Sequence, residues 1–137
     1  MSGMRPSNYP LTIYCGTTLD ADALSFVYKQ GGVIVNLTDY TASAQARTAN
    51  GDLIFDWSTA NGHMAIDGPA GSTNFVVTAA ETSALATHIK SGKPSSLTSG
   101  LATYEVGAWA LELTSPTGRV IRLVEGVLTL SPEIVRG

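Results

Sequence analysis

The stretch TASAQARTANGDLIFDW, residues 41–57, decides the fold class because apolar and polar residues alternate on both sides of Asn50-Gly51. The apolar positions of the two runs are Ala42, Ala44, Ala46, Leu53, Phe55 and Trp57. Alternation with a period of two is typical of a strand with one face in a core and the other toward water. Asn-Gly between two such runs is typical of a tight hairpin turn. The stretch therefore predicts a β-hairpin with these six side chains inside.

The same alternation recurs along the rest of the chain. Its apolar positions include Leu24, Phe26, Tyr28, Met64, Ile66, Phe75 and Val77. Turn sequences separate the runs at Gly31-Gly32, at Asn61-Gly62 and at residues 68–71. A spacing of about ten residues between turns is typical of antiparallel sandwiches and barrels. The sequence predicts a mainly β fold, an antiparallel β-sandwich of immunoglobulin-like or jelly-roll-like type.

One short helix interrupts the strands. Thr78 and Glu81 have the spacing of a capping box, which predicts a helix near residues 79–88 that packs Leu85 and Ile89 onto the sheet. The following residues, 91–100, are polar and rich in serine, so we expect an exposed, mobile loop there.

The last third of the chain predicts a long hairpin, with strands at 103–114 and 119–130 around a turn at 115–118. Apolar positions in the returning strand change parity between its start and its end. They are Ile121 and Leu123 at the start, and Leu128 and Leu130 at the end. A one-residue bulge at Glu125-Gly126 would place all four on the same face, and glycine is frequent at bulges.

Length and composition indicate one domain, which we place at residues 11–130, with an N-terminal arm at 1–10 and a C-terminal tail at 131–137. The charged fraction is 14% and the net charge is −3, so the chain lacks the basic surface that nucleic acid requires. The sequence has no apolar run of membrane-spanning length, and we expect no membrane partner. Cys15 is the single cysteine, which favours a small buried hydrophobe in a reducing cytoplasm.

Residues with catalytic or metal-binding chemistry are scattered in the sequence. His63 and His88 have no acid, histidine or cysteine at metal-ligand spacing. Asp20 and Asp22 favour a solvated turn over a cation site. We therefore expect no catalytic residue, no metal and no cofactor, and a protein that is not an enzyme.

The two tryptophans leave one binding hypothesis open. Trp57 and Trp109 each lie in an alternating run, where an aromatic side chain normally packs in the core. If either indole were exposed as a flat platform, the chain would be a carbohydrate-binding β-sandwich module.

Three stretches together resemble a known family of small tail-associated proteins of bacteriophages and prophages. They are YPLTIYCGTTL at 9–19, VNLTDYTASAQAR at 35–47, and WALEL at 109–113 followed by GRVIRLVEGVLTLSPEIVR at 118–136. Taken in this order, they are similar to the N-terminal domain of phage baseplate upper proteins. The resemblance covers most of the chain.

The resemblance implies a structural component of a virion, assembled in the cytoplasm of the bacterial host. The expected role is a tail or baseplate protein that anchors or adapts fibres or receptor-binding proteins, with a head decoration protein as the alternative. Its partners would be other virion proteins and copies of itself. We expect the N-terminal arm and the C-terminal tail to bind neighbouring proteins as extended segments. The candidate contact residues are Arg5, Tyr9, Arg119, Arg122, Pro132, Glu133 and Arg136.

Overall fold

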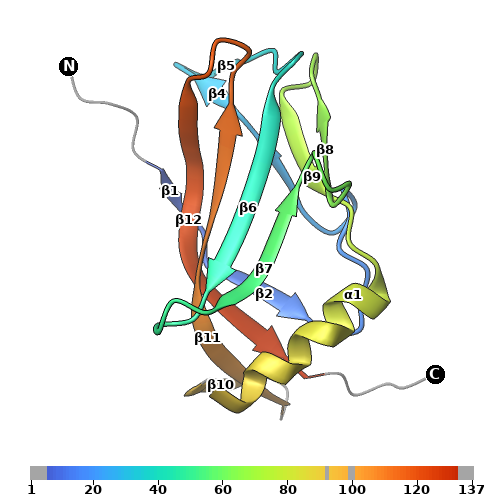
Figure 1. The fold of residues 1–137 in the computed structure, drawn as a ribbon, viewed down its shortest axis with the longest axis vertical. Helices are drawn as coiled ribbons and strands as arrows, with labels where there is room; N and C mark the ends of the chain where they lie inside the picture. The colour runs from blue at the N-terminus through green and yellow to red at the C-terminus, as the bar shows by residue number, and fades with distance from the viewer. Residues whose placement is uncertain (1–5, 92, 99–100, 133–137) are drawn as a thin grey trace.

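The computed structural model describes the backbone of residues 6–91, 93–98 and 101–132, and the side chains of residues 6–89 and 103–132. The chain forms a large sheet and a smaller one, with a short helix at one end of the layers (Figure 1). The predicted mainly β, sandwich-like fold with one short helix is confirmed.

The large sheet has seven strands built around the long C-terminal hairpin. Its strands are β1 (Ser7–Asn8), β2 (Leu11–Tyr14), β6 (Thr41–Arg47), β7 (Leu53–Ser58), β10 (Lys93–Thr98), β11 (Leu101–Thr114) and β12 (Val120–Ser131). One side of β11 pairs first with β10 and then with β6, and β7 lies outside β6. The outer side of β12 pairs with β1 and then β2, and both of these pairings are parallel rather than antiparallel.

The small sheet contains three strands in the order β3-β9-β8. They are β3 (Ser25–Val27), β8 (Met64–Asp67) and β9 (Ser72–Phe75), and a separate hairpin joins β4 (Lys29–Gln30) to β5 (Val33–Ile34). Aromatic rings fill the space between the sheets. Phe75 of β9 lies 5.5 Å from Trp57 and 6.2 Å from Trp109, measured between ring centroids. Burial of these rings supplies much of the hydrophobic driving force for packing.

The helical segment consists of α1 (Ala79–Ala84) and the 3-10 helix η1 (Leu85–Ser91). The predicted capping box is confirmed, because Thr78 and Glu81 satisfy each other's backbone N–H groups. Leu85 is buried and Ile89 packs against the core, as predicted. Thr82 is fully buried, and its hydroxyl donates to the Thr17 carbonyl at 2.7 Å. Such a short helix is therefore held by tertiary contacts.

Both predicted hairpins are confirmed. Gly51 N donates to the Thr48 carbonyl at 2.9 Å in the turn between β6 and β7, so the loop runs over residues 48–52. The turn between β11 and β12 is closed by Gly118 N and the Ser115 carbonyl, also at 2.9 Å.

Two bulges move the strand pattern away from the prediction. In β7, Ala46 pairs with Phe55 and Arg47 pairs with Leu53, so Ile54 is the extra residue. Ile54 is therefore buried and Leu53 is exposed, the reverse of the expectation from alternation.

The parity change in β12 is real, but its predicted position is wrong. Leu111 pairs with Val124 and Glu112 pairs with Arg122, which makes Leu123 the extra residue. The bulge therefore lies nearer the turn than Glu125-Gly126. A second irregularity on β11 leaves Val106 unpaired between Glu105 and Gly107.

Three segments that we expected as a loop, an N-terminal arm and a C-terminal tail contribute residues to strands of the large sheet. The predicted loop at 91–100 contains β10, which pairs with β11, and residues 92, 99 and 100 lie outside the described residues. The predicted arm at 1–10 contains β1, and Tyr9 N donates to the Glu125 carbonyl at 2.8 Å. Likewise β12 extends to Ser131, into the predicted tail. Polar composition concealed these strands because their stabilisation comes from backbone pairing with distant segments.

Candidate interaction surface and polar network

The outer face of the large sheet carries an open groove of about 730 Å³. Its floor contains the small side chains of Ala108 and Ala110 on β11, and longer side chains on neighbouring strands form its sides. The lining residues are Asn8, Ser43, Gln45, Arg47, Ala108, Trp109, Ala110, Glu112, Arg122, Glu125, Gly126 and Val127.

The alternation that builds the core also builds this groove. In β6, the three alanines point inward, so Ser43, Gln45 and Arg47 lie on the outer face. In β11, Trp109 is buried while its neighbour Ala110 lies on the outer face, opposite Gln45 on one side and Glu125 on the other. Two short side chains between two rows of longer ones leave a trough along β11.

Charge in the groove is balanced between arginine and glutamate. Arg122 bonds Glu112 through Nη2 at 3.0 Å and Glu125 through Nη1 at 3.3 Å. The bond to Glu112 and then that to Glu125 hold the pKa of Arg122 above its usual value. Arg47 donates to the Gly51 carbonyl at 3.0 Å. Exposed ion pairs of this kind contribute little to stability, so the face is best described as polar and hydrogen-bonding.

Tyr9 is an anchor of the domain rather than part of a free arm. Its ring lies edge-on to Phe26 at 5.2 Å and to Trp109 at 6.4 Å between centroids. Its carbonyl accepts the indole N–H of Trp109 at 2.8 Å. A β-carbon on Gly126 would overlap this carbonyl, so the absence of a side chain at that position permits the contact.

The other candidate contact residues are dispersed. Arg122 lies in the groove, whereas Arg119 is exposed beside the β11–β12 turn and Pro132 is half-buried after β12. Arg5, Glu133 and Arg136 lie outside the described residues. The structure therefore places one of the seven, Arg122, among the residues that line the groove.

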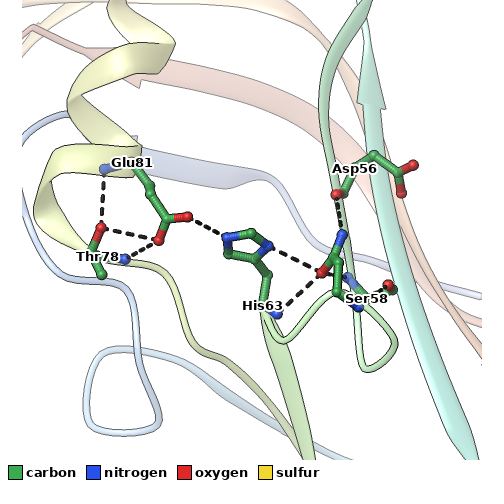
Figure 2. Close-up of polar contacts among 6 residues, drawn as sticks. Asp56, Ser58, His63, Thr78 and Glu81 are labelled. Atoms are coloured by element: carbon green, nitrogen blue, oxygen red, sulfur yellow. Dashed lines mark hydrogen bonds and ion pairs between the residues drawn. The ribbon is translucent and has the colours of Figure 1, made fainter.

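A polar network connects His63 to residues that sequence spacing did not reveal (Figure 2). Nδ1 of His63 lies 3.1 Å from Oδ1 of Asn61, and Nε2 contacts Oε2 of Glu81. The sequence places no acid at metal-ligand spacing from His63, and the fold brings Glu81 to its ring from farther along the chain. The two residues are separated by 18 positions, and the chain reverses through β8 and β9 between them. No local pattern signals such a contact.

Glu81 is held as a carboxylate by its surroundings. Its Oε1 accepts from Thr78 N at 2.9 Å and from the Thr78 hydroxyl at 3.0 Å. The backbone bond from Thr78, followed by the bonds from His63 and the Thr78 hydroxyl, lowers the pKa of Glu81 to about 2. The Thr78 hydroxyl bonds to Glu81 rather than to the ring, so the arrangement differs from a hydroxyl–histidine–acid triad. It fastens α1 to the turn before β8.

Both tryptophans are in the core, with exposed fractions of 6% for Trp57 and 2% for Trp109. Neither indole can serve as a flat sugar platform, which contradicts the tryptophan-based carbohydrate hypothesis. Cys15 is buried, as expected. Oδ1 of Asp20 accepts from the backbone of Asp22 at 3.1 Å and of Ala23 at 3.2 Å, which confirms a turn carboxylate.

The described residues lack two further kinds of feature. No group of three or more His, Cys, Asp or Glu residues in these ranges is placed to hold a metal ion. Within the same part of the chain, no helix has the length and apolar character needed to cross a membrane. No protein-family model matches the chain, and no curated protein matches it.

Proposed function

We propose that this protein is a structural component of a bacteriophage virion, a tail or baseplate protein that anchors fibres or receptor-binding proteins. One observation carries the proposal: the three stretches similar to baseplate upper proteins contribute adjacent strands of one sheet. The stretch 9–19 contains β2, 35–47 contains β6, and the stretches 109–113 and 118–136 contain the C-terminal part of β11 and all of β12. The pairings β2–β12, β12–β11 and β11–β6 make these strands continuous. The resemblance thus follows one structural unit.

The groove on the outer face of this unit is the proposed contact surface. Eight of its lining residues that face outward or form its floor belong to the resembling stretches. They are Ser43, Gln45, Arg47, Ala110, Glu112, Arg122, Glu125 and Val127. Balanced charge and many hydrogen-bonding groups suit contacts with other virion proteins or further copies of this chain. Repetition in a symmetric particle makes individually weak contacts sufficient.

The direct test is the composition of purified particles from the phage or prophage that encodes the chain. Intact particles, isolated tails and isolated heads are separated on a density gradient, and the chain is quantified in each fraction by mass spectrometry. We expect it in particles and in tails at a constant ratio to other tail proteins. Its presence only in heads would establish the decoration alternative, and its absence from all particles would overturn the virion assignment.

A matched pair of variants tests the contact surface. Ala110→Arg fills the groove floor, whereas Ala65→Arg places the same side chain on the exposed face of β8 in the small sheet. Both variants are first checked for wild-type circular dichroism and thermal midpoint. We expect Ala110→Arg to be excluded from particles and Ala65→Arg to be incorporated normally. Equal incorporation of the two folded variants would contradict the role of the groove.

A further inference from the structure

The orientation of the Asn61 amide is set by backbone groups. Its Oδ1 accepts from Ser58 N at 2.9 Å and from His63 N at 3.1 Å, while its Nδ2 donates to the Asp56 carbonyl at 2.8 Å. A reversed amide would place its own N–H groups against two backbone N–H groups and its oxygen against a carbonyl. The atom that faces Nδ1 of His63 is therefore an acceptor.

The other ring nitrogen also faces an acceptor. Nε2 contacts Oε2 of Glu81, whose second oxygen already accepts two bonds from Thr78. A carboxylate so arranged carries no proton on Oε2 at neutral pH. A neutral imidazole has one N–H, so it can satisfy one of these two acceptors, whereas an imidazolium donates to both.

We propose that the folded protein holds His63 as an imidazolium and that its two N–H groups form a proton-dependent clasp between the β7–β8 turn and helix α1. The turn side comprises Asn61, which is bonded to β7 of the large sheet. The helix side is Glu81, in the first turn of α1 (Figure 2). The clasp thus joins the two sheets and the helix at one corner, and it weakens when the ring loses its proton because one N–H becomes a lone pair.

The charged groups around the ring support this assignment. Glu81 is the ionisable residue of α1, and β9 carries none. On β7, the Asp56 carboxylate points away from the ring (Figure 2). On β8, Asp67 is at the far end of the strand. The next helical segment, η1, has His88 and Lys90 in its sequence. With 28% of its side chain exposed, His63 exchanges its proton with solvent without unfolding of the domain.

The test is ¹⁵N NMR of the ring nitrogens in the full chain, combined with amide hydrogen exchange. At pH about 6.5, where a histidine in an unfolded chain is half protonated, we expect the wild-type His63 signals to be those of an imidazolium. As the pH rises and the ring loses its proton, exchange of the Glu81 and Thr82 amides should accelerate about tenfold beyond its intrinsic pH dependence, the effect expected for one charge-assisted bond.

Glu81→Gln is the decisive variant because glutamine also completes a capping box but can turn an amide N–H toward Nε2. In this variant we expect a neutral ring with its single proton on Nδ1, and amide exchange without the extra pH-dependent step. His88→Gln is the control and should retain the wild-type His63 signals. A neutral His63 in the wild-type protein at pH about 6.5, or an imidazolium in Glu81→Gln under the same conditions, would overturn the proposal.

Discussion

Replacing Gly126 with alanine tests the contact between β12 and Tyr9, the residue that follows β1 and is packed against the core. The alanine β-carbon would overlap the Tyr9 carbonyl oxygen and lie 2.7 Å from its carbonyl carbon and 3.1 Å from Pro10 N. All three atoms belong to the backbone, so no side-chain rotation relieves the clash. The segment at Tyr9 must move away from β12, and the bond from the Trp109 indole to the Tyr9 carbonyl must lengthen or break.

The structure gives the size of the effect. Overpacking in a rigid site costs about 1–3 kcal/mol, and loss of the indole hydrogen bond costs about 1 kcal/mol more. We therefore expect Gly126→Ala to lower the free energy of unfolding by about 2–4 kcal/mol. With a urea m-value of about 2 kcal/mol per molar, the unfolding midpoint falls by about 1–2 M.

Urea unfolding followed by tryptophan fluorescence measures this change, because both indoles are buried in the native state. Gly118→Ala is the control: its φ is +89° but open space surrounds the added β-carbon, so only backbone strain of about 1 kcal/mol applies. The reasoning is refuted if Gly126→Ala destabilises the protein no more than Gly118→Ala.

Three other predictions concern the polar contacts. Because the pKa of Glu81 is lowered to about 2, its contribution to stability is complete above pH 4.5 and is lost as pH falls toward 2. Glu81→Gln should therefore remove this part of the fall in the thermal unfolding midpoint between pH 4.5 and pH 2. Thr82→Val should cost about 2 kcal/mol in urea unfolding, since it leaves Gly16 N and the Thr17 carbonyl unpaired, and Thr82→Ser should restore most of it. Arg122→Ala should cost less than about 1 kcal/mol by the same assay, and a larger loss would show that the exposed ion pairs are stronger than their exposure implies.

Strands with one buried face were predictable because burial imposes a period of two on the sequence. The run at 41–47 shows this directly, since Ala42, Ala44 and Ala46 are buried and the residues between them are exposed. The hairpin turns and the capping box were predictable for a related reason. Each depends on residues three to five positions apart, so the chemistry is local.

The remaining features of the fold depend on partners distant in sequence. The bulges at Ile54 and Leu123 are defined by how one strand is aligned with its neighbour, and the alternation within β7 alone favours a different alignment. The short strand β1 consists of Ser7 and Asn8, which have no apolar pattern. Its stabilisation comes from pairing with Val124 and Glu125 in β12.

Prediction of the candidate site was limited by the same physics. Arg122 was identified from its place near the terminal hairpin, but its two carboxylate partners depend on the bulge that brings Glu112 opposite it. The alanines of β11 gave no signal of a groove, because a trough requires longer side chains on the strands beside it. His63 and Glu81 meet only because the chain reverses between β8 and β9.

The Asn61 side chain also protects the edge strand of the large sheet. Strand β7 is the last strand on that side, and an unprotected margin invites pairing with a strand from another molecule. The Asn61 amide forms hydrogen bonds with the Asp56 carbonyl and with Ser58 N, two groups with which such a strand would pair. A single side chain thereby makes the hydrogen bonds that a neighbouring strand would make. At these two positions β7 offers no template for fibril growth, even when many copies are crowded together.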